Sequence, residues 1–169
     1  YFFRAIVEIL KAFFTEGLKP FATQSSQSKM GWFIIIGTLP IVALGLLFQD
    51  YIENQLRQLW IIGVTLILFG ILLGVADRYA PKNRSIQELD MKSGLAFGFG
   101  QALALIPGVS RSGGSITVGL MLGFTREAAA RYSFLLAIPA VIAAGGYQFL
   151  KSYQDLPQDL LLATIAATV

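Results

Sequence analysis

Two uncharged apolar stretches, residues 31–49 and 59–76, constrain the fold of this 169-residue chain more than any other feature. At about 1.5 Å per residue, a helix of that length nearly matches the roughly 30 Å hydrocarbon core of a bilayer. Residues 132–150 form a third such stretch, and a fourth begins near Leu160. We therefore predict one all-α, polytopic membrane domain over residues 1–169, truncated at both ends.

Composition agrees with this prediction and excludes several other classes of protein. Hydrophobic residues make up 55% of the chain and charged residues only 14%, which is far from the composition of a soluble or a disordered domain. The chain contains no Cys and no His, so it can form no disulfide and can supply no imidazole base. The net charge of +3 comes from basic residues scattered between apolar stretches, which predicts no nucleic-acid partner.

The distribution of Lys and Arg among the connecting segments predicts the orientation of the chain. Segments 11–30 and 77–92 carry three and four basic residues, whereas segments 50–58 and 151–159 carry one each. Cytoplasmic loops of membrane proteins are enriched in Lys and Arg. Segments 11–30 and 77–92 are therefore expected on the cytoplasmic side, and the other two on the outer side.

Residues 93–124 do not fit a simple spanning helix. Their apolar halves are about 13 and 9 residues long, too short to cross a bilayer singly, and a nine-residue segment rich in polar and turn-forming residues, 107–115, separates them. A re-entrant helix–loop–helix hairpin would bring the chain back to the cytoplasmic side. Arg126 and Arg131 would then also lie there, in agreement with the charge distribution.

The polar segment of this hairpin has the composition of an anion site. Pro107 should end the first half-helix, and the second is expected to begin near Gly114 or Ser115, with its positive end beside Arg111. The number of donors favours a phosphate or diphosphate over a carboxylate. The expected contacts are Ser110, Arg111, Ser112, Gly113, Gly114 and Ser115, with Gln101 from the first half-helix. Two alternatives remain: Arg111 reaches the interface while the serines only cap a helix, and Gln101 only joins helices.

The sequences QALALIPGVSRSG (101–113) and YSFLLAIP (132–139) closely resemble those of the undecaprenyl-diphosphate phosphatase family associated with bacitracin resistance. The resemblance implies a multi-pass hydrolase of the bacterial cytoplasmic membrane that converts undecaprenyl diphosphate to undecaprenyl phosphate, the recycled lipid carrier of peptidoglycan synthesis. It also implies an inverted-repeat helical architecture surrounded by membrane lipids. By this resemblance Arg111 and Ser110 are catalytic, in that they bind and stabilise the phosphoryl oxygens.

The same resemblance places the nucleophile and the acid–base groups upstream of Tyr1, so this chain alone is expected to be inactive. It leaves open a divalent cation and a homo-oligomer, and it assigns no metal ligand within this chain. A transporter that binds an anionic or phosphate-bearing lipid in the hairpin is the alternative function, because carriers also aim helix ends at ligands near the midplane of the membrane.

Overall fold

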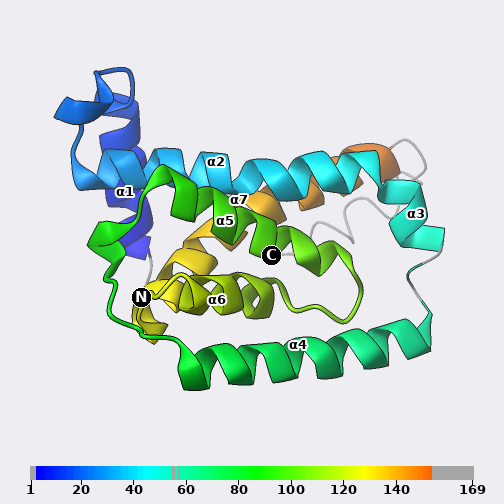
Figure 1. Ribbon diagram of the computed structural model, residues 1–169. Helices are drawn as coiled ribbons and strands as arrows, with labels where there is room; N and C mark the ends of the chain where they lie inside the picture. The colour runs from blue at the N-terminus through cyan, green and yellow to red at the C-terminus, as the bar shows by residue number, and fades with distance from the viewer. Residues whose placement is uncertain (1–2, 55, 57, 154–169) are drawn as a thin grey trace.

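The computed structural model describes residues 3–54, 56 and 58–153, and in this part of the chain all regular elements are helices. Three of them are long: α2 (Ser26–Leu47), α4 (Leu59–Tyr79) and α7 (Arg126–Tyr153). In Figure 1, α2 and α4 run along opposite sides of the molecule, and shorter helices lie between them. The fold is thus the all-α helical bundle that the sequence predicts.

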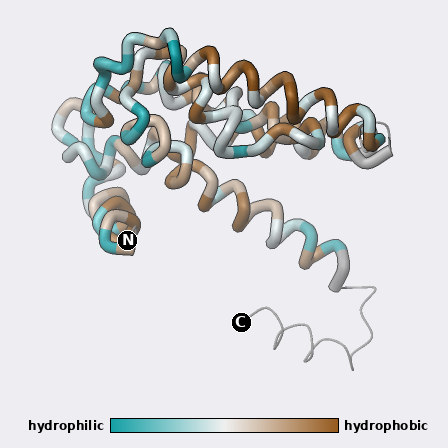
Figure 2. The backbone as a smooth tube through the Cα atoms, turned by 90° about the horizontal axis from the view of Figure 1, so that it is seen from below, coloured by the Kyte–Doolittle hydropathy of each residue, from teal (hydrophilic) through white to brown (hydrophobic). Residues whose placement is uncertain are grey.

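Each long helix is apolar and long enough to cross a membrane, and each overlaps one predicted span, although α2 ends at Leu47, two residues before the predicted boundary. At other boundaries the helices are longer than predicted: α4 continues to Tyr79, and α7 runs from Arg126 to Tyr153. Helix α2 begins five residues earlier than predicted, at Ser26, where the side chain of Ser25 accepts a hydrogen bond from the backbone N–H of Ser28. The fourth span, predicted from Leu160, lies outside the described residues. In Figure 2 the long helices are mostly hydrophobic, and hydrophilic residues gather mainly at the end near the N-terminus.

Short elements occupy the ends of the long helices. Helix α1 (Phe3–Glu16) crosses α2 steeply at one end of the molecule (Figure 1), and α3 (Gln49–Asn54) follows α2 at the other end. Single 3-10 turns, η1 (Phe21–Thr23) and η2 (Ile86–Glu88), connect α1 to α2 and α4 to the central helices.

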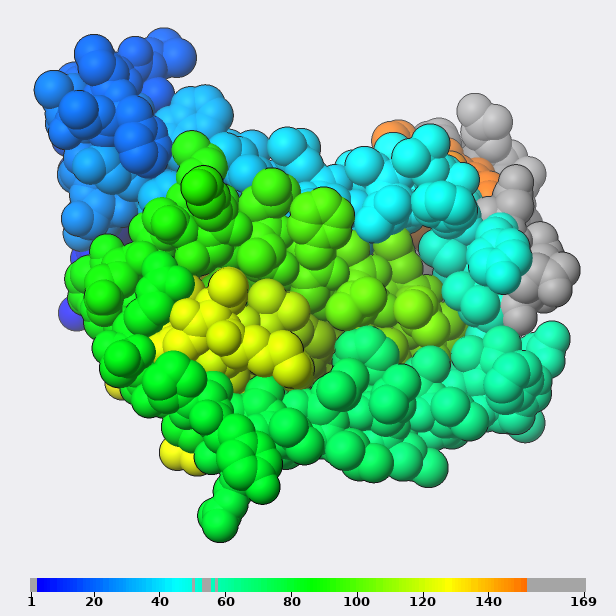
Figure 3. Space-filling model, in the orientation of Figure 1, coloured from blue at the N-terminus to red at the C-terminus, as the bar shows by residue number. Residues whose placement is uncertain are grey.

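Helices α5 (Met91–Ala102) and α6 (Arg111–Met121) form the helix–loop–helix hairpin expected between residues 93 and 124. At 12 and 11 residues, they are about half as long as a bilayer core is thick. Helix α6 packs against α4, α5 and α7, and Figure 3 shows it held between α4 and α5. The hairpin is therefore present in the fold, and its depth in a bilayer remains a prediction.

The cap of α5 fixes where the hairpin begins. The carboxylate of Asp90 accepts a hydrogen bond of 2.8 Å from the backbone N–H of Ser93. The side chain and the backbone N–H of Ser93 lower the pKa of Asp90. Because the pKa is depressed in the folded state, the stabilisation is present at neutral pH and is lost as the pH falls through the lowered pKa.

Both ends of the hairpin lie at the same end of the bundle. The backbone N–H of Arg84, before α5, donates to the carbonyl of Gly123, after α6, at 2.8 Å, and the N–H of Thr125 donates to the carbonyl of Arg84 at 2.9 Å. Arg126, the first residue of α7, donates from its guanidinium to Asp77 in the last turns of α4 at 2.9 Å. The chain therefore returns to the end of the bundle from which it left.

The core lies at this same end, where α2, α5 and α7 meet. The ring of Phe97 on α5 packs edge-to-face against Phe124 at 5.5 Å and against Tyr132 at 4.9 Å. The Tyr132 hydroxyl donates to the carbonyl of Phe33 on α2 at 2.6 Å. Helices α2 and α5 approach each other closely because Gly37 and Gly98 meet there: a Cβ on Gly98 would lie 2.1 Å from the carbonyl oxygen of Gly37.

Cysteine labelling can test the predicted orientation, since this chain has no cysteine of its own. Lys92 and Glu127 are exposed on either side of the hairpin, and Gln58 is exposed at the opposite end of α4. We expect Lys92→Cys and Glu127→Cys to react with a membrane-impermeant maleimide only from the cytoplasmic side, and Gln58→Cys only from outside. Labelling of positions 92 and 127 from opposite sides would show that the hairpin crosses the membrane fully.

Candidate functional site

The loop between α5 and α6 is anchored to α4. After α5 a 3-10 turn, η3 (Leu103–Leu105), leads to Pro107, whose carbonyl accepts a hydrogen bond of 2.7 Å from the Thr65 hydroxyl. Gly108 has a φ of 97°, and a Cβ there would lie 2.2 Å from the hydroxyl oxygen of Thr65. Only glycine fits this position, because the backbone is left-handed and touches α4.

The predicted start of the second half-helix was wrong. Helix α6 begins at Arg111 rather than near Gly114 or Ser115, because Ser110 caps it: the Ser110 side chain accepts from the backbone N–H of Gly113 at 3.2 Å. Gly114 is needed for packing within the helix, since a Cβ there would lie 2.4 Å from the carbonyl oxygen of Gly100 on α5. Arg111 therefore occupies the first turn of α6, where the free backbone N–H groups and the positive end of the helix dipole lie.

Arg111 lines a groove of about 580 Å³ between α2 and α7, which we call the Arg111 groove. One wall is formed by α2, the other by α7, and Ala104 and Leu105 of the hairpin line it between them. Its apolar lining includes Val42, Gly45, Leu46, Leu105, Ala140, Ala143 and Ala144. Its polar lining consists of Gln49, Arg111, Tyr147 and Gln148. The volume is within the range of pockets that bind small molecules.

Arg111 is the one charged side chain among the described residues that line this groove. The guanidinium is exposed, and no described carboxylate lies within ion-pair distance of it. The Ser110 and Ser112 hydroxyl oxygens lie 3.2 Å apart beside it. This end of the groove therefore combines a guanidinium, hydroxyl groups and a helix N-terminus, all of which favour an anion.

The remaining predicted contacts lie away from the groove lining. Ser115 is fully buried, and its hydroxyl donates to the carbonyl of Arg111 at 2.8 Å, within α6. Gln101 is also fully buried, and its Nε2 donates to the carbonyl of Leu136 on α7 at 3.5 Å. The geometry of Gln101 corresponds to the alternative in which it joins helices. The structure thus gathers Ser110, Arg111, Ser112 and Gly113 at one helix end and leaves Ser115 and Gln101 inside the bundle.

Sequence reasoning missed Thr65 and the polar residues of the groove outside the hairpin. Thr65 could have been singled out from the sequence, because it is the single hydroxyl-bearing residue in the stretch 59–76. No sequence pattern points to Gln49 and Tyr147, since they are 98 positions apart and only the packing of α2 and α7 brings them together.

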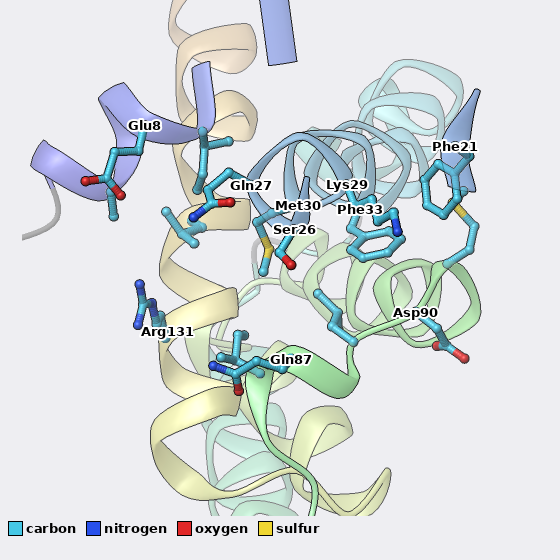
Figure 4. A pocket seen from close by; sticks show the side chains of 16 residues that line it. Glu8, Phe21, Ser26, Gln27, Lys29, Met30, Phe33, Gln87, Asp90 and Arg131 are labelled. Carbon is cyan, nitrogen blue, oxygen red and sulfur yellow. The ribbon is translucent and has the colours of Figure 1, made fainter. Parts of the chain in front are cut away.

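A second cavity, of about 600 Å³, lies at the opposite end of the bundle among α1, α2, η2 and α7. Figure 4 shows Glu8, Gln87 and Arg131 on one side of it and Lys29 and Asp90 on the other. Its lining contains two acidic and two basic side chains, so they balance in formal charge. This cavity therefore has no net formal charge, whereas the described lining of the Arg111 groove has a net positive charge.

The described residues contain no group of three or more Asp, Glu, His or Cys side chains that could hold a metal ion. The described lining of the Arg111 groove also contains no carboxylate. What this part of the chain offers a ligand is therefore cationic and hydroxyl groups.

The comparisons of this chain with known proteins agree with one another. The family model described as bacitracin resistance protein BacA matches residues 1–169. An undecaprenyl-diphosphatase of Paenarthrobacter aurescens is 50% identical over all of this chain and 64% of its own length. One from Arthrobacter sp. is 55% identical over all of this chain and 62% of its own length. Undecaprenyl-diphosphatase 2 of Agrobacterium fabrum is 53% identical over 90% of this chain and 55% of its own length. The chain thus spans less than two thirds of the length of these relatives.

Proposed function

The chain belongs to the bacitracin resistance protein BacA family, and from that premise we propose that the intact protein removes the terminal phosphate of undecaprenyl diphosphate. The product would be undecaprenyl phosphate, the lipid carrier reused in cell-wall synthesis. The proposed location is the bacterial cytoplasmic membrane, with the Arg111 end of the groove toward the outer side. The names of the relatives support hydrolysis over transport, since each is called an undecaprenyl-diphosphatase.

One observation carries the proposal: a single charged side chain, Arg111, lines a groove whose other described lining residues are uncharged and mostly apolar. A polyprenyl diphosphate has the same division into a charged headgroup and an apolar tail. The small residues Gly45, Ala143 and Ala144 leave room for the tail between α2 and α7. The headgroup would then lie against Arg111 and the first turn of α6.

The chemistry of this end of the groove suits phosphoryl transfer. A guanidinium is a planar fork that donates two hydrogen bonds to two oxygens of one phosphoryl group. The α6 N-terminus adds backbone N–H donors and a partial positive charge. Such groups stabilise the negative charge on the phosphoryl oxygens in the transition state. The role of this chain in the proposed reaction is to bind the headgroup and to stabilise that charge.

A phosphate-release assay tests the proposed function. The intact protein, purified and reconstituted in phospholipid vesicles, is expected to release inorganic phosphate from undecaprenyl diphosphate and to leave undecaprenyl monophosphate. Movement of the intact diphosphate across the vesicle membrane with no phosphate released would contradict the proposal and favour the transporter.

A further inference from the structure

The second half of α7 leaves the bundle while still forming one wall of the Arg111 groove. Ala140 is 5% exposed, but every residue from Val141 to Leu150 is exposed. Figure 2 shows the last turns of α7, just before the grey trace, running away from the other helices. The position of this wall therefore depends on few buried contacts, in contrast to the first half of the helix.

A hydrogen bond joins the two walls of the groove in this part of α7. The Tyr147 hydroxyl on α7 donates to Oε1 of Gln49 at 3.0 Å. Gln49 is the first residue of α3 and follows α2 after a single residue, so the bond joins α7 to the end of α2. Both residues line the groove together with Arg111.

The residues that line the groove near this bond indicate what kind of ligand the groove can hold. In the same groove, α2 and α7 contribute small or aliphatic lining residues, among them Gly45, Leu46, Ala143 and Ala144. These residues can bind a lipid tail only through van der Waals contacts. The energy of those contacts decreases steeply when the walls separate by even a fraction of an ångström. The affinity of the groove for a lipid tail therefore depends on the distance between α2 and α7.

We propose that the Tyr147–Gln49 hydrogen bond is a strap that fixes this distance and so determines how tightly the substrate lipid is held. The inference rests on the proposed function, because it concerns the same groove. Tyr147 and Gln49 are positioning residues: they act through the walls of the groove, and the reacting phosphate remains with Arg111. Loss of the strap should raise KM more than it lowers kcat.

Kinetics of the intact protein with undecaprenyl diphosphate test the role of the strap. Tyr147→Phe removes only the hydroxyl and is expected to raise KM by about three- to tenfold, the range of one net hydrogen bond, with kcat changed less than twofold. Gln49→Leu should have the same effect, and the double variant should be no worse than either single variant. The matched control is Tyr79→Phe, since Tyr79 is exposed at the end of α4 and away from the groove. Additive effects, or a loss confined to kcat, would overturn the proposal.

A distance measurement separates the strap from the enzyme activity. Spin labels at Leu47→Cys and Leu150→Cys, both exposed, report the separation of α2 and α7 without any substrate. Tyr147→Phe is expected to broaden the distance distribution or lengthen its mean, and an unchanged distribution would overturn the strap. If the wild-type protein released no phosphate, the proposed function would fail, and the spin labels would still decide whether the strap exists.

Discussion

Arg111→Ala in the intact protein is expected to lower kcat/KM for undecaprenyl diphosphate by about a hundred- to a thousandfold. That is the usual cost of removing one preorganised donor that stabilises charge in a transition state. Arg111 is the one charged side chain in the described lining of the groove, so within that lining no second cation can replace it. The measurement is phosphate release over a range of substrate concentrations, which separates kcat from KM.

Two companion variants make this result specific. Arg111→Lys keeps the charge but loses the two-pronged fork, so its activity should fall between those of the wild type and the alanine variant. Arg78→Ala removes an exposed arginine from the last turn of α4, away from the groove, and should leave activity unchanged. The fold should survive loss of Arg111, since its side chain is exposed and forms no ion pair with any described residue. Activity of Arg111→Ala within about threefold of the wild type would contradict the assigned role.

Gly98→Ala is expected to destabilise the fold by about 3 kcal/mol or more. The added Cβ would lie 2.1 Å from the carbonyl oxygen of Gly37, and backbone atoms cannot move aside as a flexible side chain can. Helices α2 and α5 would have to separate, and the packing of Phe97 and Tyr132 beside them would be lost. Thermal unfolding of the purified protein in detergent should show a much lower midpoint, together with a low yield.

Gly70→Ala is the matched control, because Gly70 lies in the interior of α4 and a Cβ there would meet no atom within 4 Å. The change should leave stability unchanged or raise it slightly, since alanine is the better helix former. Equal stability of the Gly98 and Gly70 variants would show that α2 and α5 do not pack as closely as the structure has them.

Much of this fold follows from local sequence signals. Long uncharged stretches predict α2, α4 and α7, because a bilayer admits few other structures for them. Two short apolar halves on either side of 107–115 predict the hairpin, and Arg126 helped to place its return. The prediction of an anion site at Arg111 used the same local signals: one cation, several hydroxyl groups and a helix end.

The errors and omissions have two sources, a helix cap that acts earlier than expected and contacts made only by tertiary packing. The second half-helix was expected to begin near Gly114 or Ser115, and Gly113 and Gly114 were counted among the contacts of the anion site. In the structure Ser110 caps the helix earlier, and Gly114 is kept inside it by close contact with α5. The Tyr147–Gln49 bond could not be predicted from either residue alone, because it depends on where α7 leaves the bundle.

The most direct test of the account is a structure of the intact protein with a non-hydrolysable phosphonate analogue of a polyprenyl diphosphate. We expect the phosphonate oxygens within hydrogen-bonding distance of the Arg111 guanidinium, and the isoprenoid chain between α2 and α7, against Val42, Leu105 and Ala143. A headgroup bound at another site, with the Arg111 groove free of ligand, would contradict the account.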